Sequence, residues 1–323
     1  MRKRTFLASL ASAIVSLTIA LGATHAASAF SGGNPIWCGL WSGVNLDVSG
    51  QCRPNPNPPL PNPPLNPGFP APPPAPAPPQ AEIYAALGDS VAAGAGLPLA
   101  SGASANDQQC ARSPYGYPNL VATQTGMQLI NASCSGAKVG DLFTDQNTAG
   151  GEVGPQLDAA FANGVPKLIT VTAGANDAHW ADFIRACYAT TCGGTGYNAV
   201  ASAYISAMKV KWHIAFNAIQ NRSHGNPPEV IMTGYYHPFS PACASPQLTA
   251  AELAWLDSEW DNLNTALQDV ASHYSFVKYI PVDFSGHDVC SSDPWVQAPT
   301  DLAPLHPTIK GQQVLANLVS TAL

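Results

Sequence analysis

Four short polar blocks in this chain carry the side-chain types that serine-based acyl transfer needs. In chain order they are Gly88-Asp89-Ser90, Cys134-Ser135-Gly136, Gly174-Ala175-Asn176-Asp177 and His306-Pro307. A serine hydroxyl becomes a good nucleophile when a neighbouring base removes its proton, and histidine titrates in the right range to do so. Backbone N–H groups and asparagine amides can stabilise the oxyanion that then forms. The four blocks therefore indicate a hydrolytic site.

The blocks need elements that bring them together. Short β-rich runs alternate with longer helical segments, which is typical of a parallel α/β domain. The runs predict strands at residues 83–87, 127–130, 168–172, 230–233 and 276–280. The first three blocks directly follow the first three strands, so we expect them at one edge of a sheet, where α/β proteins place reactive groups.

Three helices are predicted between and after these strands. Apolar side chains at spacings of three and four define two of them. One stripe is Leu253, Leu256, Trp260, Leu263, Leu267 and Val270, and the other is Val200, Tyr204, Met208, Trp212, Phe216 and Ile219. Thr249 and Glu252 form a capping box ahead of the first stripe. Residues 307–323 predict a final helix that begins just after His306.

The four blocks, taken in order, resemble the SGNH or GDSL hydrolase family over residues 83–323. The resemblance implies an α/β fold of three layers (α/β/α, flavodoxin-like) with a central, mainly parallel sheet of about five strands. It also implies Ser90 as nucleophile and His306 as general base. The oxyanion donors would be the Ser90 N–H, the Gly136 N–H and the Asn176 side chain. Taken singly, Asn176 also fits a turn cap and Gly136 a simple positive-φ position.

The sequence departs from the family at the third triad position. Many members carry an aspartate three residues before the histidine, but this chain has Ala303 there. Asp301, a more distant acid, or a backbone carbonyl near Ala303 could accept the hydrogen bond from His306 Nδ1. Residues 285–295 resemble secreted actinobacterial SGNH esterases, some of which use a main-chain carbonyl, and this favours a Ser-His dyad. A neutral acceptor can still fix the tautomer and ring orientation.

The remaining histidines and the two motif aspartates are expected to have structural rather than catalytic roles. His237-Pro238 also follows a predicted strand, but it precedes the fifth strand, where the family has no base. The remaining histidines lack ligand spacing, and no phosphate-binding loop is present, so no metal and no cofactor is expected. Ala92 interrupts the Gly-x-Ser-x-Gly elbow pattern, which argues against the α/β-hydrolase fold. Asp89 and Asp177 are expected to order their turns.

The chain is expected to be secreted. Its start combines a basic tetrapeptide, an apolar stretch and Ala27-Ser28-Ala29, which together predict a signal peptide. The expected parts are a signal peptide at 1–29, a short Cys-containing segment at 30–53, a Pro-rich linker at 54–81 and the catalytic domain at 82–323. Removing the leader changes the formal charge from −7 to −10, since 10 basic residues then face 20 acidic ones. Nucleic acid is therefore not an expected partner.

An oxidising compartment also favours disulfides for the eight cysteines. Their order along the chain suggests local pairing. The expected pairs are Cys38–Cys52, Cys110–Cys134, Cys187–Cys192 and Cys243–Cys290.

The function expected first is that of a monomeric carboxylic ester hydrolase, an esterase or lipase, acting on small-molecule or lipid esters. A polysaccharide acetyl esterase would use the same residues, and the N-terminal segment with its spacer would suit a tether to an insoluble substrate. A noncatalytic binding module is a third alternative, which the joint presence of Ser90, Asn176 and His306 opposes. Trp180 and the aromatics of residues 115–117 are candidates for the acyl or alcohol pocket, although buried aromatics more often belong to the core.

Overall fold

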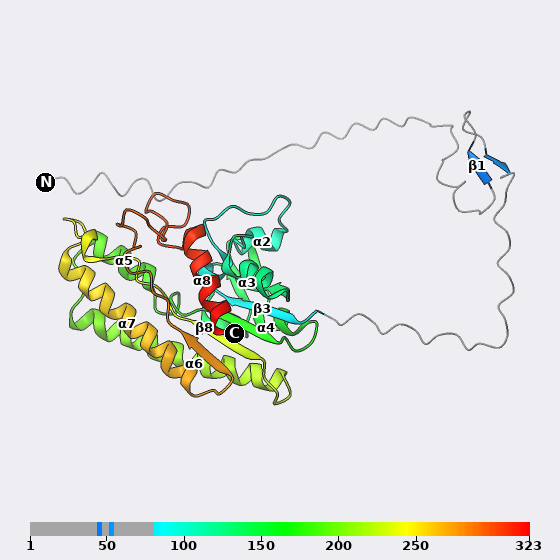
Figure 1. Cartoon of the computed structure of the whole chain (residues 1–323). Helices are drawn as coiled ribbons and strands as arrows, with labels where there is room; N and C mark the ends of the chain where they lie inside the picture. The colour runs from blue at the N-terminus through cyan, green and yellow to red at the C-terminus, as the bar shows by residue number, and fades with distance from the viewer. Residues whose placement is uncertain (1–43, 47–51, 55–80) are drawn as a thin grey trace. The chain divides into compact units, whose positions relative to one another are not determined.

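The computed structural model describes residues 44–46, 52–54 and 81–323. The predicted signal peptide, the Cys38–Cys52 pair and almost all of the predicted linker lie outside these residues. β1 (Val44–Leu46) and β2 (Cys52–Pro54) pair as a small antiparallel sheet. They belong to a different unit of the chain from Ala77–Leu323, which carries all four polar blocks (Figure 1).

A five-stranded parallel sheet forms the centre of the second unit. The strand order is β4 (Gln128–Asn131), β3 (Ile83–Gly88), β7 (Leu168–Thr172), β8 (Glu229–Thr233) and β9 (Val277–Ile280), and each neighbouring pair is parallel. All five predicted strands are confirmed, with ends shifted by one residue at most. β7 is buried along its whole length, as expected for a strand covered on both faces.

Helices cover both faces of this sheet. α3 (Tyr117–Thr125) packs beside α8 (Ile309–Ala322), and α6 (Thr195–Arg222) packs beside α7 (Ala250–Ser272) (Figure 1). The predicted α/β/α fold is therefore confirmed. The remaining elements are α1 (Ser90–Ala93), α2 (Ala105–Gln109), η2 (Val139–Leu142), β5 (Gln146–Thr148), β6 (Gly151–Val153), α4 (Gln156–Phe161), α5 (Trp180–Ala189) and η3 (Pro241–Cys243).

The helix predictions hold with two corrections. α7 begins at the predicted Thr249–Glu252 capping box and buries its whole predicted stripe. On α6 the stripe is wrong at its start, because Val200 is 44% exposed. The buried face of α6 passes through Ala201 and Met208, seven residues apart, so Val200 lies about 100° away from it. α8 begins two residues later than predicted, because Thr308 caps it by accepting from Gly311 N.

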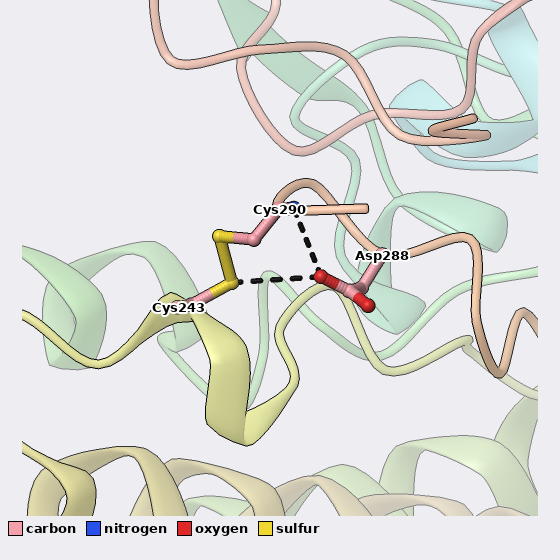
Figure 2. Close-up of side chains that lie close together, drawn as sticks. All are labelled: Cys243, Asp288 and Cys290. Carbon is pink, nitrogen blue, oxygen red and sulfur yellow. Dashed lines mark hydrogen bonds between the residues drawn. A yellow bond between two sulfur atoms is a disulfide. The ribbon is translucent and has the colours of Figure 1, made fainter. Parts of the chain in front are cut away.

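Three disulfides are present among residues 81–323. They are Cys110–Cys134, Cys187–Cys192 and Cys243–Cys290, as expected. Figure 2 shows Asp288 beside the third disulfide, where its Oδ1 accepts from Cys290 N at 2.9 Å and lies 3.5 Å from Cys243 Sγ. These three residues are close enough together to suggest a metal site. The two sulfur atoms are bonded to each other in the disulfide, however, and so are not free thiolate ligands. The cluster is a structural link between two loops.

Candidate active site

The segment that carries Ser90, called here the nucleophile turn (residues 88–90), joins β3 to α1. Gly88 has φ +127°, and a Cβ on it would lie 2.2 Å from the Thr172 carbonyl oxygen of β7. Asp89 N donates to that same oxygen at 2.8 Å. Only glycine allows β3 to end this close to β7, so the turn lies directly on the sheet.

Buried side chains hold the nucleophile turn in place. The Gln156 side chain donates to Gly88 O at 2.9 Å and accepts from Gly88 N at 2.7 Å. Asp89 caps α1, because its Oδ1 accepts from Val91 N at 2.9 Å. The backbone N–H and carbonyl of Gly88 are thereby both hydrogen-bonded, and the carbonyl also accepts from Cys134 N at 2.9 Å, so Ser90 follows at a fixed position.

Ser90 and His306 meet at the carboxyl edge of the sheet. The His306 Nε2 lies 2.7 Å from the Ser90 Oγ, although the two residues are 216 positions apart. Burial lowers the pKa of His306, while hydrogen bonds to the Pro304 and Ala303 carbonyls act in the opposite direction. The imidazole is therefore held neutral, and a neutral imidazole can take a proton from a hydroxyl.

Two backbone carbonyls face the other ring nitrogen. The His306 Nδ1 lies 3.2 Å from Ala303 O and 3.1 Å from Pro304 O. Asp301 instead caps a local turn, where its Oδ2 accepts from Ala298 N at 2.7 Å. A proton on Nδ1, donated to these carbonyls, leaves Nε2 free to accept from Ser90.

The segment that carries His306, called here the base loop (residues 295–306), has no regular structure of its own. Leu305 adopts φ +66°, which costs about 1–2 kcal/mol for a residue with a side chain. Its backbone is tied down on both sides, because Leu305 N donates to Gln297 O at 3.0 Å and Leu305 O accepts from Tyr236 at 2.7 Å. Gln297 also donates from Nε2 to Ala95 O at 2.9 Å, which links the loop to the segment after α1.

Gly136 and Asn176 lie on neighbouring turns. Gly136 is exposed with φ +80°, so a substrate atom can approach its N–H without meeting a side chain. Asn176 Nδ2 donates to Ala137 O at 2.9 Å, which ties the two turns together and leaves its second amide hydrogen available. Within residues 81–323, the N–H groups of Ser90 and Gly136 donate to no protein acceptor.

The two aspartates of the motifs, Asp89 and Asp177, form hydrogen bonds and an ion pair with neighbouring segments. Asp177 is buried, where it accepts from Val139 N at 2.8 Å and pairs with Lys211 at 2.7 Å. Asp89 accepts from the Tyr235 hydroxyl at 2.5 Å, yet burial outweighs this bond and raises the pKa of Asp89 to about 7. These contacts agree with the structural parts expected for both residues.

His237, the alternative base, points toward α7. Its Nδ1 lies 2.5 Å from Asp257 Oδ1, and its Nε2 lies 3.3 Å from Asp261 Oδ1. Both ring nitrogens are therefore engaged by carboxylates. Among the described residues, His306 is the histidine that contacts Ser90.

An apolar cavity of about 140 Å³ lies between the loop after β8 and the first half of α7. Its lining includes Trp180, Phe239, Leu253 and Trp260. Trp180 is four residues after Asn176 in the chain, and the residues that line the cavity do not include Ser90, Asn176 or His306. Of the 115–117 aromatics, Tyr117 is fully buried and belongs to the core, whereas Tyr115 is 43% exposed and does not line this cavity.

Sequence reasoning missed several residues that organise the site. Gln156 and Gln297 are single glutamines with no motif around them. Tyr235 and Tyr236 follow β8. Their place at the end of a strand was the only sign that they belong to the site, since the ends of β3 and β7 also carry site residues.

No helix in the described part of the chain is long and apolar enough to cross a bilayer.

A parallel sheet between two helical layers, with a serine and a histidine paired at its carboxyl edge, defines the class of α/β acyl hydrolases. Residues 86–314 match the GDSL-like lipase/acylhydrolase family, and the chain belongs to that family. It is a carboxylic ester hydrolase.

Relatives support this assignment. A lipase of Streptomyces rimosus is 30% identical over 248 residues, which cover 72% of this chain and 83% of that lipase. The crystal structure of an extracellular lipase from Streptomyces rimosus is similar with a TM-score of 0.61 and 27% identity, over 75% of this chain and 100% of the other. A phospholipase A1 from Streptomyces albidoflavus shares the fold, with a TM-score of 0.57 and 22% identity over 75% of this chain and 100% of that one.

Proposed function

We propose that this protein hydrolyses carboxylic esters through an acyl-enzyme on Ser90, with His306 as general base. The observation that carries the proposal is the 2.7 Å contact between Ser90 Oγ and His306 Nε2. Two other donors lie on neighbouring turns: the Asn176 amide is hydrogen-bonded to the residue after Gly136, and Cys134 N, two residues before Gly136, donates to Gly88 O at 2.9 Å. Nucleophile, base and oxyanion donors are the groups that ester hydrolysis requires.

The reaction has two halves. Ser90 Oγ attacks the ester carbonyl carbon while its proton moves to His306 Nε2, and the oxyanion is stabilised by the Ser90 and Gly136 N–H groups and the Asn176 amide. The C–O bond to the alcohol breaks as His306 returns the proton to the leaving oxygen. Water then attacks the acyl-enzyme, gives a proton to His306, and releases the carboxylic acid while Ser90 recovers its hydrogen.

The base works as a dyad with carbonyl support. The Ala303 and Pro304 carbonyls would hold the imidazole orientation and the Nδ1 proton, which are two tasks of the aspartate in a triad. They supply no full negative charge, so the imidazolium formed during attack is stabilised less than in a triad. Asp301 has no part in this arrangement.

The substrate class is an ester with an apolar acyl chain. The cavity beside Trp180 is lined mainly by apolar side chains, as an acyl-chain site would be, and Trp180 lies on the segment that follows Asn176. The similar protein from Streptomyces rimosus is named a lipase, which agrees with a lipidic substrate.

Ester hydrolysis by the purified mature protein tests the proposal. The substrates are p-nitrophenyl acetate, butyrate and palmitate, with acetylated xylan as a further arm because a polysaccharide acetyl esterase would use the same residues. Ser90→Ala and His306→Ala should each lower kcat by about 10³-fold or more, whereas Asp301→Ala should retain activity. A wild-type protein inactive on every ester would instead support a binding module.

We also propose that the protein is exported as a monomer. The N-terminal pattern predicts a leader that ends at Ala29, and the disulfides of the catalytic unit suit an oxidising compartment. Sequencing the N-terminus of protein from culture medium should give Phe30 as the first residue. Sedimentation should give the mass of one chain.

A further inference from the structure

Ser90 and His306 come from opposite ends of the catalytic unit, and one dipeptide after β8 reaches the segments that carry both. Tyr235 and Tyr236 are 2% and 3% exposed, and their hydroxyls point to different parts of the site. Neither residue belongs to the four polar blocks, and neither hydroxyl contacts Ser90 Oγ or the His306 ring. Their contacts are with the backbone and side chains next to these groups.

The Tyr235 hydroxyl connects the nucleophile turn to the turn that carries Asn176. It donates to Asp89 Oδ2 at 2.5 Å, and Asp89 is the residue immediately before Ser90. It also accepts from Ala175 N at 3.2 Å, and Ala175 immediately precedes Asn176. One oxygen atom therefore fixes the separation between the nucleophile and an oxyanion donor.

The Tyr236 hydroxyl connects the same dipeptide to the base loop. It donates to Leu305 O at 2.7 Å, on the residue before His306. The Tyr236 ring stacks on Phe284, with centroids 4.4 Å apart and planes 13° from parallel. This hydrogen bond holds Leu305, the one residue of the base loop that adopts a left-handed conformation. The orientation of the next side chain, that of His306, therefore depends on this hydrogen bond.

The dipeptide is itself held rigidly. Asn264 of α7 makes two hydrogen bonds to the backbone of Tyr235, accepting from its N and donating to its O, each at 2.8 Å. The Tyr235 ring packs edge-on against Trp260, with centroids 5.7 Å apart. Gly234 N donates to Ile280 O at 2.8 Å, which anchors the segment to β9. The end of β8 and α7 thus provide a fixed support for both hydroxyls.

We propose that Tyr235 and Tyr236 are positioning residues that set the distance and alignment among nucleophile, oxyanion donors and base. The proposal rests on the proposed function, since it assigns a task relative to Ser90 and His306. Reacting groups separated by 216 positions in the chain have no local structure in common. A shared support that is bonded to both segments holds them at the separation that the 2.7 Å contact requires.

The test removes each hydroxyl and keeps each ring. Tyr235→Phe and Tyr236→Phe are compared with Tyr84→Phe, because the Tyr84 hydroxyl is equally buried and bonds to Thr170 Oγ1 at 2.7 Å, near the start of β3. The readouts are kcat and KM on p-nitrophenyl butyrate at a temperature well below unfolding, together with the thermal midpoint. Asn264→Ala is a fourth variant, in which the Tyr235 hydroxyl is intact but its support is lost.

We expect both site variants to lower kcat by about 10- to 100-fold with KM changed by less than about 2-fold, because misplaced reacting groups slow the chemical step. Tyr84→Phe should lower the thermal midpoint but leave kcat within about 2-fold of wild type. Should Tyr235→Phe fail to fold, Asn264→Ala and Tyr236→Phe must still show the loss of kcat.

Equal kcat values in the site variants and in Tyr84→Phe would overturn the inference. Failure of the proposed function gives a different result, because the wild type would then be inactive or Ser90→Ala would remain active. An active wild type that depends on Ser90 but not on the two hydroxyls refutes the positioning role alone.

Discussion

The nucleophile turn and the base loop are built in different ways. The nucleophile turn lies between β3 and α1, and its backbone is bonded to the neighbouring strand through Thr172 O and to Gln156. The base loop lies between β9 and α8. It belongs to no strand, and a single isolated β-bridge joins Val296 to Pro307 at its two ends. Ser90 is placed by a strand end that is bonded to its neighbouring strand, whereas His306 is placed by hydrogen bonds to the backbone of an irregular loop.

This difference predicts unequal tolerance to change. A turn built against a sheet has no space for an added atom, because the sheet cannot move to accept it. A loop held by a few hydrogen bonds to its backbone depends on those bonds more than on which side chains it carries. Four experiments test the comparison, starting with the largest expected effect.

Gly88→Ala should destabilise the protein by about 3 kcal/mol or more, because it combines a strained φ of +127° with a Cβ 2.2 Å from Thr172 O. Gly164→Ala is the matched control, since Gly164 has φ +112° and nothing within 4 Å of the added Cβ. Denaturant unfolding measures both. Equal losses in the two variants would mean that packing against β7 does not constrain the nucleophile turn.

Asp89→Asn should change how stability depends on pH. Burial raises the pKa of Asp89 to about 7, so the folded protein retains a proton that the unfolded chain releases near pH 4. The stabilising contribution of Asp89 is therefore present below about pH 4 and is lost as pH rises to about 7, at up to about 1.4 kcal/mol per pH unit. The free energy of unfolding of the variant should rise relative to wild type across this window. A difference that is constant from pH 4 to pH 8 would contradict the interpretation.

The acidic limb of kcat/KM should have its midpoint below 6.5, the ordinary pKa of histidine. Burial lowers the pKa of His306, and only the neutral ring accepts a proton from Ser90, so activity should rise as pH increases through the lowered pKa. Initial rates on p-nitrophenyl butyrate from pH 4 to pH 9 measure this limb. The same limb in Asp89→Asn would assign it to His306, whereas a limb that disappears in that variant would assign it to Asp89.

Leu305→Gly should have the smallest effect, within about 1 kcal/mol of wild-type stability. Glycine relieves the left-handed strain at φ +66°, but it increases the entropy of the unfolded chain by a similar amount. The carbonyl that accepts from Tyr236 remains. A loss as large as that of Gly88→Ala would show that the side chain of Leu305, rather than its backbone, holds the base loop.

The two regions also differ in how far the sequence predicts them. The apolar runs predicted all five strands, and the strand ends predicted that Ser90, Gly136 and Asn176 lie at one edge of the sheet, because a motif that directly follows a strand has its location determined by the sheet; their roles, like that of His306, came from the family resemblance. His306 was assigned through family resemblance and its place before the last helix. Its Nδ1 partner remained open, since a backbone carbonyl has no residue type by which to recognise it.

Other features depend on tertiary structure alone. Val200 fitted the spacing of an apolar stripe, yet α6 turns that position to solvent. Gln156, Tyr235 and Tyr236 act through hydrogen bonds to residues 68 or more positions away. Periodicity and short motifs report local preferences, so such long-range contacts leave no pattern in the sequence.

The location of the disulfides has a consequence for how the enzyme would respond to a reducing medium. The central strands contain no cysteine, whereas two of the three described disulfides join segments around the site: Cys110 to the residues before Gly136, and Cys243 to the stretch that leads into the base loop. The hydrogen-bonded sheet needs no such covalent support, but exposed loops are where proteases cut first. Cys110 and Cys134 are fully buried, whereas Cys290 is exposed, so a reducing medium would open the Cys243–Cys290 disulfide first and release the stretch that leads into the base loop while the sheet stays folded.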